Sequence, residues 1–118
     1  MSDVILHLAP AERWRTWPAG AAYLPEAYAA DGFVHCTAGD ELMLAVANRF
    51  YGEVPGDFVA LTIDPARLTS ELRWEASGDD LAPLFPHVYG PIDADAVLAV
   101  RPMVRAAGGR FIGFGSDQ

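Results

Sequence analysis

Residues 71–91, ELRWEASGDDLAPLFPHVYGP, contain two short strand-like segments with only a turn between them. The first segment is residues 71–75, and the second is residues 87–89. Gly78-Asp79-Asp80 is typical of the turn that separates them. A parallel pair of strands would need a helical crossover, so the sequence predicts an antiparallel arrangement here.

Further strands are predicted on both sides of this stretch. Apolar runs and turn residues indicate strands at residues 3–8, 32–37, 58–63, 96–105 and 110–114. Helical spacing indicates two real helices, both early in the chain, at residues 11–17 and after Thr37 to about residue 51. The 118 residues fit one domain, residues 1–118. We therefore predict an α+β fold with a small, mainly antiparallel, bent β-sheet.

Composition restricts the classes of partner. The net charge of −8 and the pI near 4.6 argue against nonspecific binding to nucleic acid or to an anionic membrane surface. Cys36 is the single cysteine, so an internal disulfide is excluded. The sequence shows neither a signal-peptide pattern nor an apolar run of membrane-spanning length. A cytoplasmic protein that binds a small molecule is the simplest expectation, and the oligomeric state is left open.

Alternation along four strands separates an apolar set of side chains from a polar set. The apolar set is expected in the core: Val4, Leu6, Leu8, Val34, Cys36, Leu72, Trp74 and Val88. The other set carries polar or titratable groups: His7, His35, Thr37, Arg73, Glu75, His87 and Tyr89. If the strands share a sheet, the second set forms a polar floor, and we predict a site there.

His35, Glu75 and His87 are the predicted catalytic residues. Histidine titrates near neutral pH, so it can move a proton or hold a hydroxyl group or a phosphate. A neighbouring carboxylate orients an imidazole and can support positive charge at a sugar carbon. The alternatives are structural hydrogen bonds for the histidines and a strand-end ion pair between Glu75 and Arg73 or Arg49.

The predicted ligand-binding residues surround these groups. Thr37 is expected to cap the following helix, whose free N–H groups would attract an anion next to His35. Arg49 would clamp a phosphate or carboxylate, and the alternative is an exposed polar pair with Asn48. The full predicted set is His7, Thr37, Asn48, Arg49, Arg73 and Tyr89.

Two other chemistries are not expected. Adjacent strand residues point to opposite faces, so Cys36 is predicted to be a small buried hydrophobe and not the partner of His35. No two metal-ligand residues have the short spacing of a zinc-binding helix, so no metal is predicted. Residues 18–32, rich in proline and glycine, are predicted to be mostly loop, of the kind that often closes over a pocket.

The motif order resembles that of the DUF952 family of small bacterial proteins. The motifs that carry the resemblance run from about residue 4 to residue 103: ILHL at 5–8 followed by Trp14, DGFVHCT at 31–37, VANRFY at 46–51, LRWE at 72–75 and FPHVYGP at 85–91. The layout is also similar to that of the ADP-ribosyltransferase-like superfamily, which includes RNA 2′-phosphotransferases.

This second resemblance implies NAD as a substrate. His7 would hold the ribose of the nicotinamide half, and residues 35–37 would supply the second motif. Glu75 is one counterpart of the catalytic glutamate, and the segment of His87 and Tyr89 is the other. The resulting hypothesis is a His/Glu-lined pocket for NAD or an ADP-ribose-containing ligand, with ADP-ribose transfer as its activity. The alternatives are a noncatalytic sensor of a small anionic metabolite, a metal-dependent hydrolase and a protein-interaction domain.

Overall fold

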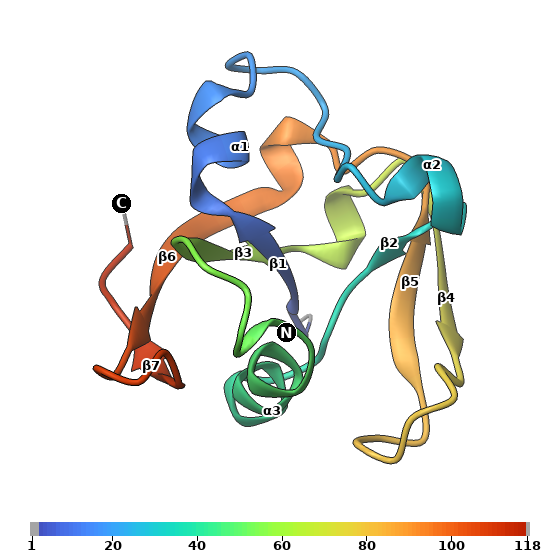
Figure 1. Cartoon of the computed structure of the whole chain (residues 1–118). Helices are drawn as coiled ribbons and strands as arrows, with labels where there is room; N and C mark the ends of the chain where they lie inside the picture. The colour runs from blue at the N-terminus through green and yellow to red at the C-terminus, as the bar shows by residue number, and fades with distance from the viewer. Residues whose placement is uncertain (1–2, 118) are drawn as a thin grey trace.

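The computed structural model describes residues 3–117, and its strands pair antiparallel throughout those residues (Figure 1). The larger sheet has the strand order β1-β3-β6-β7. Its strands are β1 (Ile5–Pro10), β3 (Phe58–Ile63), β6 (Val97–Arg105) and β7 (Phe111–Phe114). The predicted strands at 58–63 and 96–105 agree with β3 and β6 to within one residue, because both have clear apolar patterns and flanking turns.

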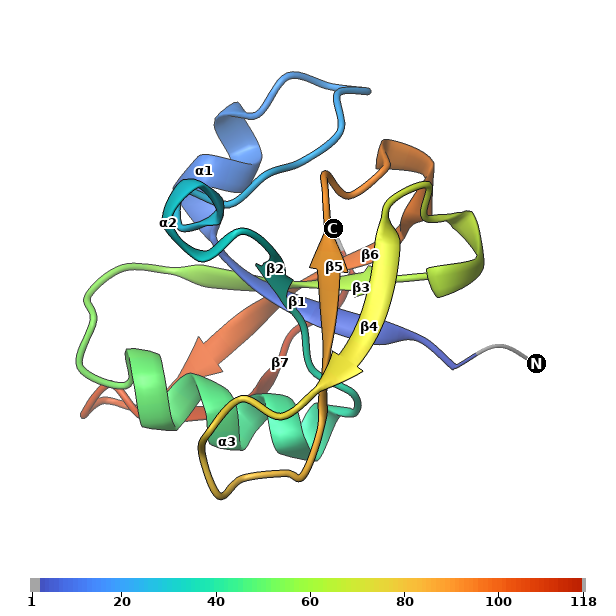
Figure 2. The ribbon, with the colours of Figure 1, turned by 90° about the vertical axis from the view of Figure 1, so that its right-hand side faces the viewer.

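A smaller sheet has the order β2-β5-β4. Its strands are β2 (Val34–His35), β5 (Phe85–Tyr89) and β4 (Glu71–Glu75). Figure 2 shows β4 and β5 crossing the strands of the larger sheet at a steep angle. An isolated bridge joins Leu6 of the edge strand β1 to Thr37, two residues after the edge strand β2. The predicted bent sheet is therefore two antiparallel sheets joined at one point.

Helices cover the two faces of the larger sheet (Figure 1). The helix α1 (Ala11–Thr16) lies on one face, and α3 (Asp40–Tyr51) lies on the other. The remaining helical turns are short: α2 (Tyr28–Asp31), η1 (Pro65–Arg67) and η2 (Ala94–Ala96). None of the helices among residues 3–117 is long and apolar enough to cross a membrane.

Two apolar clusters result, and strand β1 contributes to both. Ile5 and Ala9 pack between the two sheets and beneath α1, whereas Leu6 packs against Met43 and Ala47 of α3. This double burial explains why β1 is apolar on both faces apart from His7.

Four sequence-based expectations need correction. Trp74 is 50 % exposed, because β4 is the outer strand of the small sheet and its apolar side extends beyond the core. Val4 precedes β1 and is exposed. Thr37 does not cap α3, which begins at Asp40 with Gly39 as its N-cap, because the Thr37 backbone pairs with Leu6 instead. The helix N-terminus expected beside His35 is thus displaced along the chain.

Residues 18–32 are mostly loop, as predicted, but the loop is anchored. Backbone hydrogen bonds in both directions join Tyr23 to Ile92, with N···O distances of 2.8 and 2.9 Å. The Tyr23 side chain is buried at 1 % exposure, and Trp14 and Trp17 pack edge-on against its ring. The two tryptophans pack against the same core cluster as Tyr23, and this part of the loop belongs to the core.

Candidate functional site: a glutamate–histidine–tyrosine cluster

The small sheet brings three of the predicted residues into direct register. His35 on β2 lies opposite His87 on β5, and Arg73 on β4 lies on the other side of His87. Side chains of directly opposed residues share one face of a sheet. Residues two positions along a strand share that face as well, so Glu75 and Tyr89 join the row. We call this the outer face of the small sheet, because the opposite face carries the core residues Val34 and Val88.

Glu75 is the centre of the outer face. Its Oε1 accepts a hydrogen bond from His87 Nδ1 at 2.9 Å and another from the Tyr89 hydroxyl at 2.5 Å. The Tyr89 bond first, and the His87 bond second, lower the pKa of Glu75, so the carboxylate is ionised at neutral pH. The same carboxylate raises the pKa of Tyr89, which remains a phenol. The predicted alternative of an ion pair from Glu75 to Arg73 or Arg49 is wrong, since Arg73 pairs with Glu71 and Arg49 with Asp80.

The acceptor on Glu75 fixes the tautomer of His87. A carboxylate only accepts hydrogen bonds, so His87 Nδ1 carries a proton. That Nε2 atom is buried and has no hydrogen-bond partner among the described residues. The structure therefore contains an oriented imidazole whose second nitrogen makes no hydrogen bond to the described residues.

Phe33 covers His87, and the sequence analysis missed it. The two rings stack at a centroid distance of 4.2 Å with 25° between their planes. Phe33 also contacts His35 at 4.6 Å and Tyr89 at 5.4 Å. Phe33 lies two residues before His35, so strand alternation extended back by one step would have placed it on the polar face.

His35 lies at the exposed rim of the cluster. Its side chain is 58 % exposed, and its Nε2 lies 2.9 Å from Oδ2 of Asp31, at the end of α2. The ring of His35 is 5.5 Å from that of His87, edge to face. Asp31 also escaped the sequence analysis, although it lies four residues before His35. A ligand on the outer face would meet His35 first.

Arg73 is held by its own neighbours. Its guanidinium makes two hydrogen bonds to the carboxylate of Glu71, at 2.9 and 3.1 Å, and lies 4.7 Å above the ring of Tyr89. The Arg73 bond lowers the pKa of Glu71. The outer face thus carries one guanidinium beside the carboxylates of Glu71, Glu75 and Asp31, and it is negative overall.

His7 is not part of the outer face. Its imidazole lies between the sheets, 5 % exposed, and Nδ1 donates to the backbone oxygen of His35 at 2.7 Å. Burial, the largest influence, lowers the pKa of His7 to about 4, so the ring is neutral. Its Nε2 faces no hydrogen-bond partner within residues 3–117, and neither does the hydroxyl of Tyr23, whose ring is 5.9 Å away. The structure brings His7 to the His35 backbone but not to the other predicted side chains.

Three further predicted residues lie outside the cluster. Thr37 is buried at 4 % exposure, at the bridge to β1. Asn48 makes a two-way pair with the backbone of Phe111, at 2.8 and 3.0 Å, and so fastens α3 to β7. Arg49 forms an exposed ion pair with Asp80 in the loop between β4 and β5. These contacts give structural roles that the sequence pattern could not distinguish from ligand binding.

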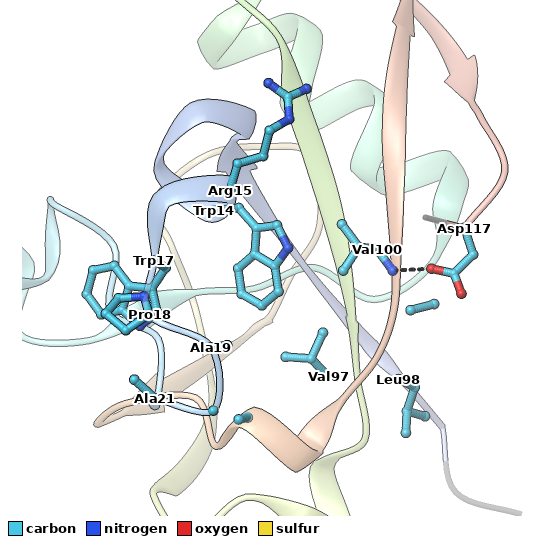
Figure 3. A pocket seen from close by; sticks show the side chains of 13 residues that line it. Trp14, Arg15, Trp17, Pro18, Ala19, Ala21, Val97, Leu98, Val100 and Asp117 are labelled. Carbon is cyan, nitrogen blue, oxygen red and sulfur yellow. Dashed lines mark hydrogen bonds between the residues drawn. The ribbon is translucent and has the colours of Figure 1, made fainter.

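A surface groove of about 520 Å³ lies elsewhere, between α1, the following loop and β6 (Figure 3). Trp14 and Val97 lie along it, and Asp117 accepts a hydrogen bond from the Val100 N–H at its edge. None of the predicted site residues lines this groove. The polar cluster and this groove are therefore separate features.

Cys36 behaves as predicted. It is buried, and burial raises the pKa of its thiol, so it is not a nucleophile. Among the residues that the structure describes, no group of three or more histidine, cysteine, aspartate or glutamate side chains is arranged to hold a metal ion.

Comparisons with known proteins agree with the architecture. A family model described as "Protein of unknown function (DUF952)" matches residues 8–100. The crystal structure of protein CC0527 from Caulobacter crescentus is similar, with a TM-score of 0.76 and 26 % identity over 92 % of this chain and 93 % of that one. The solution NMR structure of CC0527 gives a TM-score of 0.69 and 28 % identity over 90 % and 89 % of the two chains. No curated protein matches.

Proposed function

Since the chain belongs to the DUF952 family and its titratable groups meet on the outer face of the small sheet, we propose that this face binds NAD⁺. The observation that carries the proposal is the ionised Glu75, held by His87 and Tyr89 beside aromatic rings. An oriented carboxylate next to aromatic faces suits a cationic ring joined to a sugar.

The charge of the outer face favours the pyridinium end of NAD⁺ over a bare anion. Glu71 and Glu75 lie beside the guanidinium of Arg73, which is already paired with Glu71, and Asp31 adds a third carboxylate next to His35. The pyridinium of NAD⁺ is positive, so this end of the ligand would be attracted whereas a free phosphate would be repelled. A sensor for a small anionic metabolite fits this face less well, for the same reason.

Glu75 gives the face a chemical role beyond binding. In ADP-ribose transfer the bond between ribose C1′ and the nicotinamide nitrogen breaks, and its electron pair moves to the ring nitrogen. The sugar carbon gains positive charge until an acceptor oxygen attacks it and releases a proton. Glu75 Oε1 is used by two donors, which leaves Oε2 to stabilise that positive charge.

Binding without turnover is the second candidate function. His87 Nε2 is buried and Phe33 stacks on the ring, so the imidazole nearest to Glu75 is out of reach of an attacking oxygen in this arrangement. A protein in this state would hold NAD⁺ and leave it intact.

Ligand binding and turnover are tested separately. We expect NAD⁺ to raise the unfolding midpoint, since a ligand at 100 times its Kd adds about 2.7 kcal/mol of stability. ADP should bind more weakly than NAD⁺, because it lacks the cationic ring. Equal shifts with NAD⁺ and ADP would contradict the charge argument, and no shift with either would refute the proposal.

Release of nicotinamide from NAD⁺, followed by chromatography, separates the enzyme from the binder. Glu75→Gln should abolish release, whereas Glu71→Gln, a carboxylate on the same face that bonds to neither His87 nor Tyr89, should preserve it. If wild-type protein binds NAD⁺ and releases no nicotinamide, the result supports the noncatalytic function and contradicts the transferase activity.

A further inference from the structure

The groove beside α1 has apolar walls. Its volume of about 520 Å³ is in the range of small-molecule sites, and Figure 3 shows Trp14 beside Val97 and Val100 of β6 in it. Leu98 also lines the groove and is 48 % exposed. The helix α1 packs on β1 and β3, so these side chains at the start of β6 lie outside the area that it covers. Uncovered apolar surface of this kind is typical of a binding site.

The groove also contains a cation without a partner. The chain has eight cationic side chains, all of them arginine. Six of these make hydrogen bonds or ion pairs with other residues: Arg13, Arg49, Arg67, Arg73, Arg101 and Arg105. Arg15, at one end of the groove, makes neither within residues 3–117, although the chain carries a net charge of −8. Its guanidinium is therefore available to an anionic group of a ligand.

Trp14 adds a second donor to the groove. The indole N–H of Trp17 donates to the backbone oxygen of Ala22 at 3.1 Å, whereas the indole N–H of Trp14 has no acceptor among the described residues. A guanidinium and an indole N–H only donate hydrogen bonds, and a carboxylate only accepts them. The planar fork of arginine also matches the two oxygens of a carboxylate. The free polar groups next to α1 thus suit a carboxylate.

Asp117 limits the charge of the ligand. Its Oδ1 accepts a hydrogen bond from the Val100 N–H at 2.6 Å, and Figure 3 shows it on the other side of β6 from Trp14. The residue is exposed, so its carboxylate would repel a second negative group at that edge of the groove. The charges therefore favour a ligand with one carboxylate, placed at the Arg15 end, and no other anionic group.

We infer that this groove binds a monocarboxylate with an apolar body, whose carboxylate pairs with Arg15 and whose body lies between Trp14 and the start of β6. Burial of the body supplies most of the affinity, and the guanidinium supplies the preference for an anion. The groove is separate from the outer face of the small sheet, so the inference does not depend on NAD⁺ binding.

Probes that share one tail test the head group of the ligand. Octanoate, octanol and octylammonium are titrated separately, and ¹H–¹⁵N NMR follows the indole N–H signals of the three tryptophans. Octanoate should shift the signal of Trp14 and leave that of Trp74, on β4, unchanged. It should bind about tenfold more tightly than octanol or octylammonium, the effect of one charge-assisted contact. Acetate, which lacks the tail, should bind at least about tenfold more weakly than octanoate.

A pair of arginine variants tests the role of Arg15. Arg15→Gln keeps the length of the side chain and removes its charge, so octanoate should bind about tenfold more weakly and octanol equally well. Arg110→Gln is the matched control, because Arg110 also lacks an ion pair within residues 3–117 but does not line the groove. Its loss changes the net charge equally and should leave octanoate binding unchanged. Glu75→Gln should leave it unchanged as well.

Four outcomes would overturn the inference. They are no binding of octanoate, equal affinities for acetate and octanoate, equal weakening in Arg15→Gln and Arg110→Gln, and tighter binding of octylammonium than of octanoate. The last result would assign the groove to cations through Asp117. If octanoate binds as expected and NAD⁺ does not bind, the result supports the inference and contradicts only the proposed function.

Discussion

His7 and His87 have the same local arrangement in two different surroundings. Each donates from Nδ1 to an oxygen, each has a buried Nε2 with no partner among residues 3–117, and each lies next to an aromatic ring. The oxygen is a backbone carbonyl for His7 and an ionised carboxylate for His87. The ring next to His7 is Tyr23, which packs against two tryptophans. The ring next to His87 is the partly exposed Phe33.

The comparison shows that two neighbours decide the surroundings of a strand histidine. They are the oxygen that accepts from its Nδ1 and the aromatic ring that packs on it. The backbone carbonyl of His35 and the buried ring of Tyr23 surround His7, which is a neutral part of the core. A carboxylate and a partly exposed aromatic cover make His87 an oriented imidazole just beneath the outer face. Both histidines occupy polar positions in an alternating strand, so the sequence pattern is the same for the two.

The largest expected difference concerns the two covering rings. Tyr23→Ala should cost about 3–5 kcal/mol of unfolding free energy, as for other fully buried aromatic side chains. Phe33→Ala should cost about 1 kcal/mol, because its ring is partly exposed. Urea unfolding measures both values.

Tyr23→Phe is the matched control, since it keeps the ring and removes only the hydroxyl. It should be nearly neutral. Equal losses of unfolding free energy in Tyr23→Ala and Phe33→Ala would show that the two rings are equally buried. The contrast between the two histidines would then disappear.

The second difference is the response of His7 to pH. Its pKa is about 4 in the folded chain and 6.5 when exposed, so the unfolded state binds more protons between these values. Stability should therefore be complete above pH 6.5 and decline as the pH falls, by about 3 kcal/mol near pH 4.

Replacement of His7 isolates its contribution from that of the carboxyl groups. His7→Asn keeps a donor for the carbonyl of His35 and removes the titration. The variant should lose less stability than wild type between pH 6.5 and pH 5. Parallel pH profiles of the two proteins would show that His7 is not a buried neutral imidazole.

A third contrast separates two neighbours on α3. Asn48→Ala should cost about 1–3 kcal/mol, because it leaves both backbone groups of the buried Phe111 without partners. Arg49→Ala should leave the unfolding midpoint unchanged, because its ion pair with Asp80 is exposed. Thermal unfolding monitored by circular dichroism measures both, and a larger loss for Arg49→Ala would reverse their assigned roles.

The last contrast concerns two carboxylates of the outer face, Glu75 and Glu71, and it is measured by the pKa of Tyr89. Glu75→Ala should lower the pKa of Tyr89 toward its ordinary value, because the carboxylate no longer accepts the phenol proton. Ultraviolet titration of the tyrosines detects this change. Glu71→Ala, the control, should change the pKa of Tyr89 much less, and equal changes in both variants would remove Glu75 from the centre of the cluster.

Local patterns gave most of the strands, because alternation and turn residues act over short distances. The segments 58–63 and 71–75 were predicted with the observed boundaries. Alternation also placed His35, Glu75 and His87 on one face, and register then brought them together. Trp74 shows the limit, since the pattern marks an apolar face but not whether the strand lies at the outer edge of its sheet.

The errors at the site have a tertiary origin. His7 was grouped with the other histidines because a pattern cannot show that two sheets meet at Leu6 and Thr37 and enclose it. Asn48 was assigned to the ligand because its pairing with Phe111 spans 63 residues. Phe33 was missed because an apolar residue at the start of a strand was not considered as part of a polar face.

The affinity of NAD⁺ for His7→Asn and Glu75→Gln, measured by isothermal titration calorimetry, tests the central contrast most directly. We predict that His7→Asn binds NAD⁺ as wild type does and that Glu75→Gln binds it at least about tenfold more weakly, the loss of one charge-assisted contact. The opposite order, with binding lost in His7→Asn and kept in Glu75→Gln, would place the ligand between the sheets and contradict the account.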